Sequence, residues 1–132
     1  MRFLLLSLSV LSLGYALDYR CPERIETKQS LKISAHEDFE PLTNSFEEYQ
    51  NLDLISLYSG HPKQGASLVP TDESNAKEPF WNFQPNDEFG VWMKCGYANT
   101  TVSLVRKLPP TTKKCTLKHK TKPKNEKFLS CH

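Results

Sequence analysis

The stretch 91-VWMKCGYANTTVSLVRKL-108 decides the fold class of this chain. Residues 91–97 alternate with a period of two, which is typical of a β-strand. Val91, Met93, Cys95 and Tyr97 share one side, and Trp92, Lys94 and Gly96 share the other. Residues 98–100 form a turn around Asn99, a residue type that tolerates a left-handed backbone. Because residues 101–108 then return rich in β-branched and aliphatic side chains, the stretch predicts a β-hairpin that serves as the scaffold.

Other short segments with alternating or apolar side chains predict further strands. They lie at residues 31–34, 52–59, 66–69, 80–83, 113–121 and 126–131. Proline, glycine and asparagine separate these segments and break the ladders between them. About seven or eight short strands indicate an all-β fold, a small antiparallel sandwich or open barrel.

One segment is compatible with either a helix or a loop. Phe39, Leu42, Phe46 and Tyr49 are spaced by three, four and three residues, and Pro41 suits the first turn of a helix. This pattern predicts one short helix near 41–50 or, equally, a loop with a helical turn.

The N-terminus has the pattern of a secretory signal peptide. Arg2 precedes an apolar run from Phe3 to Leu13, and Gly14-Tyr15-Ala16 provides small residues before a cleavage point. The run is shorter than the ~20 residues that a membrane span needs. We therefore expect residues 1–16 to be removed and residues 17–132 to form one secreted β-domain without a membrane partner.

Four cysteines, Cys21, Cys95, Cys115 and Cys131, form an even set in an exported chain. An oxidising compartment favours disulfides, and four cysteines allow three pairings. We expect Cys95 with Cys115, and Cys21 with Cys131, which would tie the two ends together. A zinc site is disfavoured because no Cys-x-x-Cys pair occurs, so no metal and no cofactor are expected.

Charge is distributed unevenly along the chain. Residues 35–90 hold eleven acidic side chains and two lysines, whereas residues 106–132 hold nine basic side chains and one glutamate. Lys118, Lys120, Lys122 and Lys124 are two apart, as expected for one solvated face of an edge strand. Aromatic residues for base stacking are not interleaved with these lysines, so nucleic acid is not expected as a partner.

The sequence lacks the usual catalytic signatures. It contains no Gly-x-Ser-x-Gly, no His-Glu-x-x-His and no phosphate-binding glycine loop. The four histidines show no metal-ligand spacing. We therefore expect no enzymatic activity and no catalytic residue.

Two conspicuous features have structural explanations. Asn99-Thr100-Thr101 matches a glycosylation acceptor, but a turn asparagine explains Asn99 equally in a bacterial protein. Among the clustered aromatic residues, Trp92 and Phe83 are expected in the core, because large rings on adjacent strands fill a sandwich well. Trp81 fits either the core or a binding anchor.

Several motifs together resemble a family of small, uncharacterised periplasmic proteins of Gram-negative bacteria. They are Tyr19-x-Cys21-Pro22, the run 57-LYSGHP-62, Trp81, the run 91-VWMKCGYANT-100 with its Trp-x-x-Cys-x-Tyr core, Leu104-x-Arg106-x-Leu108-Pro109, and Cys115. Some relatives lie near type VI secretion loci. The resemblance thus implies a periplasmic binding or inhibitor protein, in particular an immunity protein that neutralises a cell-wall-directed toxin, with an exported hydrolase or toxin as its protein partner.

Two other functions stay open. A periplasmic lysozyme inhibitor is similar in size, export and disulfide-stapled β-structure, and carries a Ser-Gly pair before a basic residue, as in Ser59-Gly60 here. An envelope stress protein without a toxin partner is the third. Because loops on a rigid sheet commonly carry binding residues, the partner-binding residues are predicted at Ser59, Gly60, His61 and Lys63. The acidic loop 72–78 is a second candidate, suited to a basic toxin.

Overall fold

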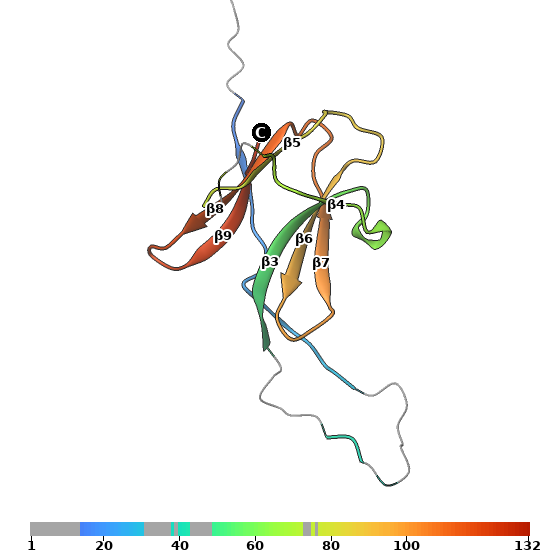
Figure 1. Ribbon diagram of the computed structural model, residues 1–132. Helices are drawn as coiled ribbons and strands as arrows, with labels where there is room; N and C mark the ends of the chain where they lie inside the picture. The colour runs from blue at the N-terminus through green and yellow to red at the C-terminus, as the bar shows by residue number, and fades with distance from the viewer. Residues whose placement is uncertain (1–13, 31–37, 39, 43–48, 73–74, 76) are drawn as a thin grey trace, which may run out of the picture.

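A computed structural model describes residues 14–30, 38, 40–42, 49–72, 75 and 77–132 (Figure 1). The described part contains nine strands and one short 3₁₀ helix, which confirms an all-β fold. The strands are β1 (Leu17–Tyr19), β2 (Arg24–Glu26), β3 (Tyr49–Ser59), β4 (Ser67–Leu68), β5 (Phe80–Asn82), β6 (Val91–Tyr97), β7 (Ser103–Lys107), β8 (Lys114–Lys120) and β9 (Glu126–Cys131). The 3₁₀ helix, η2, spans Pro62–Gln64.

The strands form two antiparallel sheets, which are seen side by side in Figure 1. One has the order β1-β9-β8-β5, and the other has the order β2-β3-β6-β7 with β4 also paired to β3. Consecutive strands β6 and β7, and β8 and β9, pair as hairpins. The predicted hairpin at 91–108 is therefore confirmed, and Asn99 in its turn has the expected left-handed backbone, with φ of 59°.

The core lies between the inner faces of the two sheets. Along β6 the buried side chains recur every second residue, which is the strand period read from the sequence. In β3 this period holds for Ile55 and Leu57, after a register shift between Leu52 and Leu54. Both sheets supply the most deeply buried residues: Leu57, Met93, Leu108, Cys115 and Leu129. Trp81 is also buried, and its indole Nε1–H donates to the carbonyl of Leu68 at 3.2 Å. Trp81 is thus a core residue.

All four cysteines form disulfides, but the predicted pairing is wrong. Cys21 bonds Cys95, and Cys115 bonds Cys131. Cys115 and Cys131 are opposite each other in the β8–β9 pair, with Cα atoms 4.1 Å apart. Lys114 and His132, the next pair, exchange both backbone hydrogen bonds, so the cysteines occupy the intervening position where side chains approach most closely. Cys95 lies in the other sheet and meets Cys21 on the segment that crosses from β1 to β2.

Some sequence predictions need correction or remain outside the described part. The predicted strand at 31–34 lies outside the described residues, as does most of the predicted helix or loop at 41–50. The structure adds β1 and β2, which have three residues each and are too short to show a period. Phe83, predicted in the core, is partly buried and packs against it. Trp92, also predicted in the core, belongs to the side of β6 that faces away from it, so this prediction is wrong.

Candidate partner-binding surface

The predicted binding turn, residues 59–65, is held rigidly at the end of β3. The Ser59 N–H donates to the Ala66 carbonyl at 2.9 Å, and the Gly60 N–H donates to the Gly90 carbonyl at 2.8 Å. Gly60 has φ of 76°, and a Cβ there would lie 2.5 Å from the Gln64 Oε1. The positive φ favours glycine, whereas the flexible end of Gln64 could move aside, so the backbone conformation of Gly60 sets the direction in which the chain leaves the sheet.

His61 connects the turn to the sheet beneath it. Its ring lies against the Trp92 ring, with centroids 4.6 Å apart and planes inclined by 60°. Its Nδ1 accepts from the Lys63 N–H at 3.1 Å and thereby caps η2. The imidazole is thus positioned from two sides, by an aromatic contact and by a backbone hydrogen bond.

The four predicted residues contribute in different ways. His61 is partly exposed and Lys63 is exposed, so both offer side chains to a partner. Ser59 is partly buried and Gly60 is buried, and their backbone groups are used in the hydrogen bonds of the turn. The structure thus brings His61 and Lys63 to the surface, while Ser59 and Gly60 shape the turn.

Sequence reasoning missed the sheet surface beside this turn. Tyr58, Trp92 and Lys107 lie in one cross-strand row, and Lys94 and Val105 in the next. These residues alternate with the buried Leu57, Met93 and Cys95, and so point away from the core. We call Leu54, Tyr58, Trp92, Lys94, Val105 and Lys107 the outer face. The alternation at 91–97 assigns Trp92 and Lys94 to one side, but only strand register adds Tyr58 and Lys107.

The outer face combines aromatic rings with uncompensated positive charge. The Lys94 Nζ lies over the Tyr58 ring, 5.6 Å from its centroid. None of the four ion pairs found within the described residues includes Lys63, Lys94 or Lys107. Tyrosine and tryptophan are enriched among the residues that dominate binding energy in protein interfaces, and a cation over a ring adds a favourable contact.

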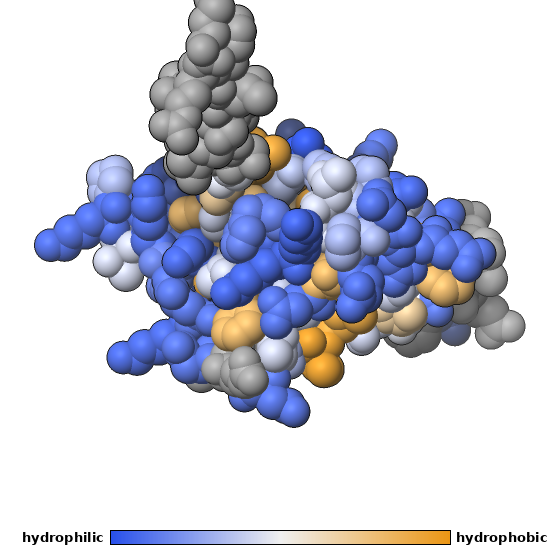
Figure 2. Space-filling view, turned by 90° about the horizontal axis from the view of Figure 1, so that it is seen from above, coloured by the Kyte–Doolittle hydropathy of each residue, from blue (hydrophilic) through white to orange (hydrophobic). Residues whose placement is uncertain are grey.

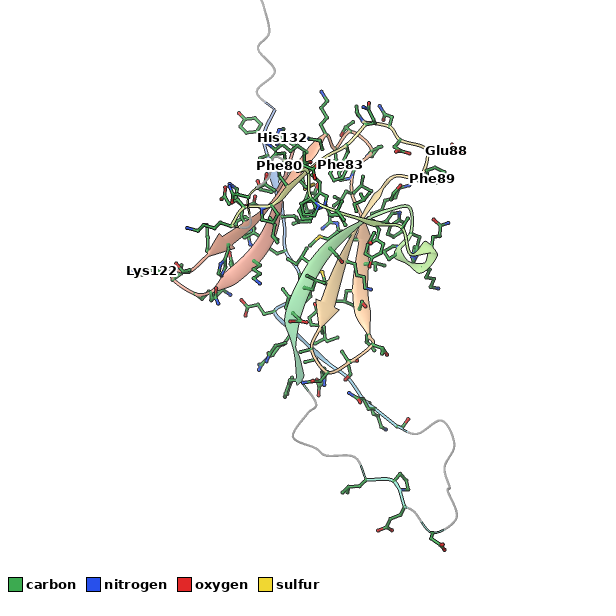
Figure 3. The ribbon with its side chains drawn as sticks, in the orientation of Figure 1. Phe80, Phe83, Glu88, Phe89, Lys122 and His132 are labelled. Atoms are coloured by element: carbon green, nitrogen blue, oxygen red, sulfur yellow. A yellow bond between two sulfur atoms is a disulfide. The ribbon has the colours of Figure 1, made fainter. Side chains whose placement is uncertain are left out.

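A hydrophobic residue extends this surface. Phe89 is 60 % exposed. It lies beside the turn, because a Cβ built on Gly60 would be 3.7 Å from the Cβ of Phe89. Figure 3 shows Phe89 and Glu88 together at the end of the molecule that carries η2. By contrast, the face shown in Figure 2 is mostly hydrophilic and carries only separate apolar patches.

Among the described residues of the acidic segment 72–78, Glu78 contacts the other sheet. The Glu78 carboxylate pairs with the Lys118 ammonium of β8 at 3.1 Å. Within the same segment, the Asn75 side chain accepts hydrogen bonds from the N–H groups of Lys77 and Glu78. Part of this segment is outside the described residues, and its role in binding stays a prediction.

A cleft of about 550 Å³ lies where the chain crosses between the sheets, beside Cys21 and Leu52. Four of its five charged lining residues are paired with one another, and Lys127 is the fifth. Lys124 contacts Glu23, and Arg20 lies 3.4 Å from Glu126. The Glu23 carboxylate raises the pKa of Lys124 through this hydrogen bond and its charge. These ion pairs within the cleft indicate that it has a structural role where the chain crosses between the sheets.

The remaining chemistry of the described part is limited. No group of three or more His, Cys, Asp or Glu side chains there is arranged to hold a metal ion. In the same residues, no helix has the length and apolar character needed to cross a membrane. Burial raises the pKa of Tyr97, whose hydroxyl donates to the Pro22 carbonyl at 2.9 Å.

The fold and this surface define a small disulfide-bonded β-protein whose candidate site is a surface for another protein. The model of the type VI secretion system Tli immunity protein family matches residues 46–132, most of the chain. This chain therefore belongs to that family, and it is an immunity protein that neutralises a toxin. The match includes β3 to β9 and starts after Cys21, β1 and β2. No curated protein and no solved structure matched.

Proposed function

We propose that this protein acts in the periplasm, where it binds an incoming toxin through the 59–65 turn and the outer face. The match to the immunity protein family is the observation that supports a toxin as the partner. Two disulfides among the described residues support an oxidising compartment. The protein acts by occupying the toxin, without catalysis of its own.

The turn and the outer face form one candidate surface. His61 lies on Trp92, Trp92 is opposite Tyr58 in the sheet, and Lys94 lies over Tyr58. These contacts hold the side chains in place before a partner arrives, which lowers the entropy lost on binding. The free lysines favour an acidic region on the toxin, in place of the basic toxin that the acidic 72–78 loop would suit.

Co-expression tests this function. An immunity function predicts that an exported toxin is encoded beside this gene. That toxin, directed to the periplasm, should stop growth, and this protein should restore it. The purified pair should bind with a Kd on the order of nanomolar, as natural tight complexes do. A cytoplasmic form starting at Leu17 is the matched control and should not protect. Protection by that form would contradict the periplasmic site of action, and lack of binding would contradict the function.

The target of the toxin needs a separate measurement. If the toxin is directed at the cell wall, it should release soluble fragments from purified peptidoglycan, and this protein should stop that release. Lysozyme digestion of the same peptidoglycan should continue unchanged at excess protein. Inhibition of lysozyme would instead favour the lysozyme-inhibitor function.

Processing of the N-terminus is measured in the same cells. Residues 1–16 are proposed to be removed during export, which leaves Leu17 as the first residue. Leu17 begins β1 and is opposite Cys131, so cleavage there retains the whole strand. Mass spectrometry of the periplasmic protein should find this N-terminus, and a retained Met1 would contradict the proposal.

A further inference from the structure

β7 is a sheet edge with one side free. It ends the order β2-β3-β6-β7, and among the described residues only β6 pairs with it (Figure 1). It has five residues, whereas β1 and β5, the end strands of the other sheet, have three each. Because the carbonyl of Phe80 in β5 also accepts from Thr71, a neighbouring segment partly covers that strand. β7 is thus the longest uncovered edge in the described part.

The register shows which backbone groups point outward. The Leu108 N–H donates to the Val91 carbonyl at 2.9 Å, so this pair is hydrogen-bonded. Hydrogen-bonded and non-bonded pairs alternate in an antiparallel ladder. Arg106 and Leu104 therefore bond to β6, and the N–H and C=O groups of Ser103, Val105 and Lys107 face away from it.

The opposite side of β6 confirms this alternation. The Gly60 N–H donates to the Gly90 carbonyl at 2.8 Å, which makes the even-numbered residues of β6 the ones bonded to β3. The odd-numbered residues are then bonded to β7. Five residues of β7 thus provide three outward donors and three outward acceptors, and no other hydrogen bond in the described part uses them.

The side chains protect this edge only in part. Proteins commonly guard exposed edges with proline, bulges, lysines or charges that point inward, and of these β7 has Lys107 and the inward Arg106. β7 contains no proline, and its pairing with β6 shows no register shift. Arg106 lies over the Tyr19 ring at 4.9 Å on the inner side, while Leu104 and Val105 are 39 % and 41 % exposed.

We propose that an extended segment of the toxin adds to β7 as a further strand and carries acidic side chains toward Lys107 and Lys94. An extended backbone is the ligand whose hydrogen-bonding groups match this edge. Both lysines lie on the outer face without a carboxylate partner among the described residues. A second copy of this chain is disfavoured, because two β7 edges would place four lysines on one continuous face.

This inference rests on the proposed function, and one pair of variants tests it. Val105→Pro removes an outward N–H and leaves the bonds from Leu104 and Arg106 to β6 in place. Val105→Thr keeps that N–H and the branched shape, so it reports the effect of the side chain alone. The purified toxin should bind Val105→Pro at least about tenfold more weakly than Val105→Thr.

Hydrogen exchange provides a readout that does not depend on a variant. In the wild-type complex, exchange at the Val105 and Lys107 amides should slow by at least about tenfold, because they gain partners. Equal affinities of the two variants, or unchanged exchange at both amides, would overturn this inference while wild-type binding upheld the function. A free dimer in light scattering that Val105→Pro converts to a monomer would show that a second copy occupies the edge, and would also overturn it.

Discussion

At the scale of the residue, His61 has two roles that a substitution can separate. Its Nδ1 caps η2 by accepting from the Lys63 N–H, and its ring lies against Trp92 at the edge of the outer face. The first role maintains the turn, and the second places an aromatic surface where a partner can contact it. Asparagine at this position retains a capping acceptor but has no ring.

We predict that His61→Asn and His61→Ala both weaken toxin binding by about tenfold, the typical effect of removing one important interface side chain. His119→Asn, at an exposed histidine of β8 in the other sheet, is the matched control and should bind as wild type. Calorimetric titration measures all three. If His61→Asn bound as tightly as wild type, the contribution of His61 would be confined to the geometry of the turn.

Tyr97 predicts a specific dependence of stability on pH. Burial raises its pKa, so the folded protein retains the phenol proton more strongly than the unfolded chain. The stabilisation is fully present below the unfolded pKa of about 10 and is lost as pH rises through the folded value.

Tyr97→Phe should therefore lose about 1 kcal/mol at pH 7, through the missing hydrogen bond to Pro22. It should then lose less further stability than wild type as pH rises above about 10, where the unfolded chain ionises before the folded protein. Urea unfolding across this range measures both effects. Tyr49→Phe, at a tyrosine that is 55 % exposed, is the control. A Tyr97→Phe variant with the alkaline slope of wild type would contradict the assigned cause.

At the scale of the element, the two disulfides connect different parts of the fold. Cys115–Cys131 links adjacent strands of one hairpin across a separation of 16 residues. Cys21–Cys95 links the segment between β1 and β2 to β6, across a separation of 74 residues. The longer loop restricts the unfolded chain more.

Removal of Cys21–Cys95 should accordingly cost about 4.5 kcal/mol, and removal of Cys115–Cys131 about 3 kcal/mol, in the chain-entropy model. The variants are the paired substitutions Cys21→Ala with Cys95→Ala, and Cys115→Ala with Cys131→Ala, which leave no free thiol. Urea unfolding of the purified proteins gives the difference. A larger loss for the hairpin disulfide would show that local strand pairing, and not loop closure, sets the order.

At the scale of the whole molecule, charge is arranged differently in space from its arrangement along the chain. The acidic Glu78 is paired with Lys118, and Glu23 with Lys124, so part of the charge seen in the sequence is neutralised internally. The outer face retains Lys94 and Lys107 without such partners in the described part, and Lys63 extends it. Three lysines that belong to none of the ion pairs among the described residues therefore lie in or beside the proposed binding turn.

This arrangement predicts that added salt slows association with the toxin. The association rate should fall by at least about threefold between about 0.05 and 0.5 M salt, because screening shortens the range of steering. Lys107→Ala should reduce both the rate at low salt and its dependence on salt. Lys122→Ala, at the distant tip of the β8–β9 hairpin (Figure 3), is the matched control and should change neither. A rate independent of salt would exclude steering by these lysines.

The sequence by itself determined the features that depend on neighbouring residues. The alternation at 91–97 and the turn at Asn99 predict a hairpin because side-chain period and backbone φ are local properties. The Gly60-His61-Pro62 break likewise predicts a turn at the end of β3, where the structure has it. The all-β class follows from such segments, and the even cysteine count, together with the predicted signal peptide, predicts that all four are bonded.

Only the tertiary structure decided which distant residues meet. Cys115 pairs with Cys131 because register places them opposite each other, and no local pattern distinguishes this pairing from two others. The contact between His61 and Trp92, the outer face built from three strands, and the free edge of β7 also depend on sheet order and register. These are non-local quantities, set by how the strands pack and pair. They place aromatic rings, charged side chains and backbone hydrogen-bonding groups beside the predicted binding turn, and so define the candidate surface.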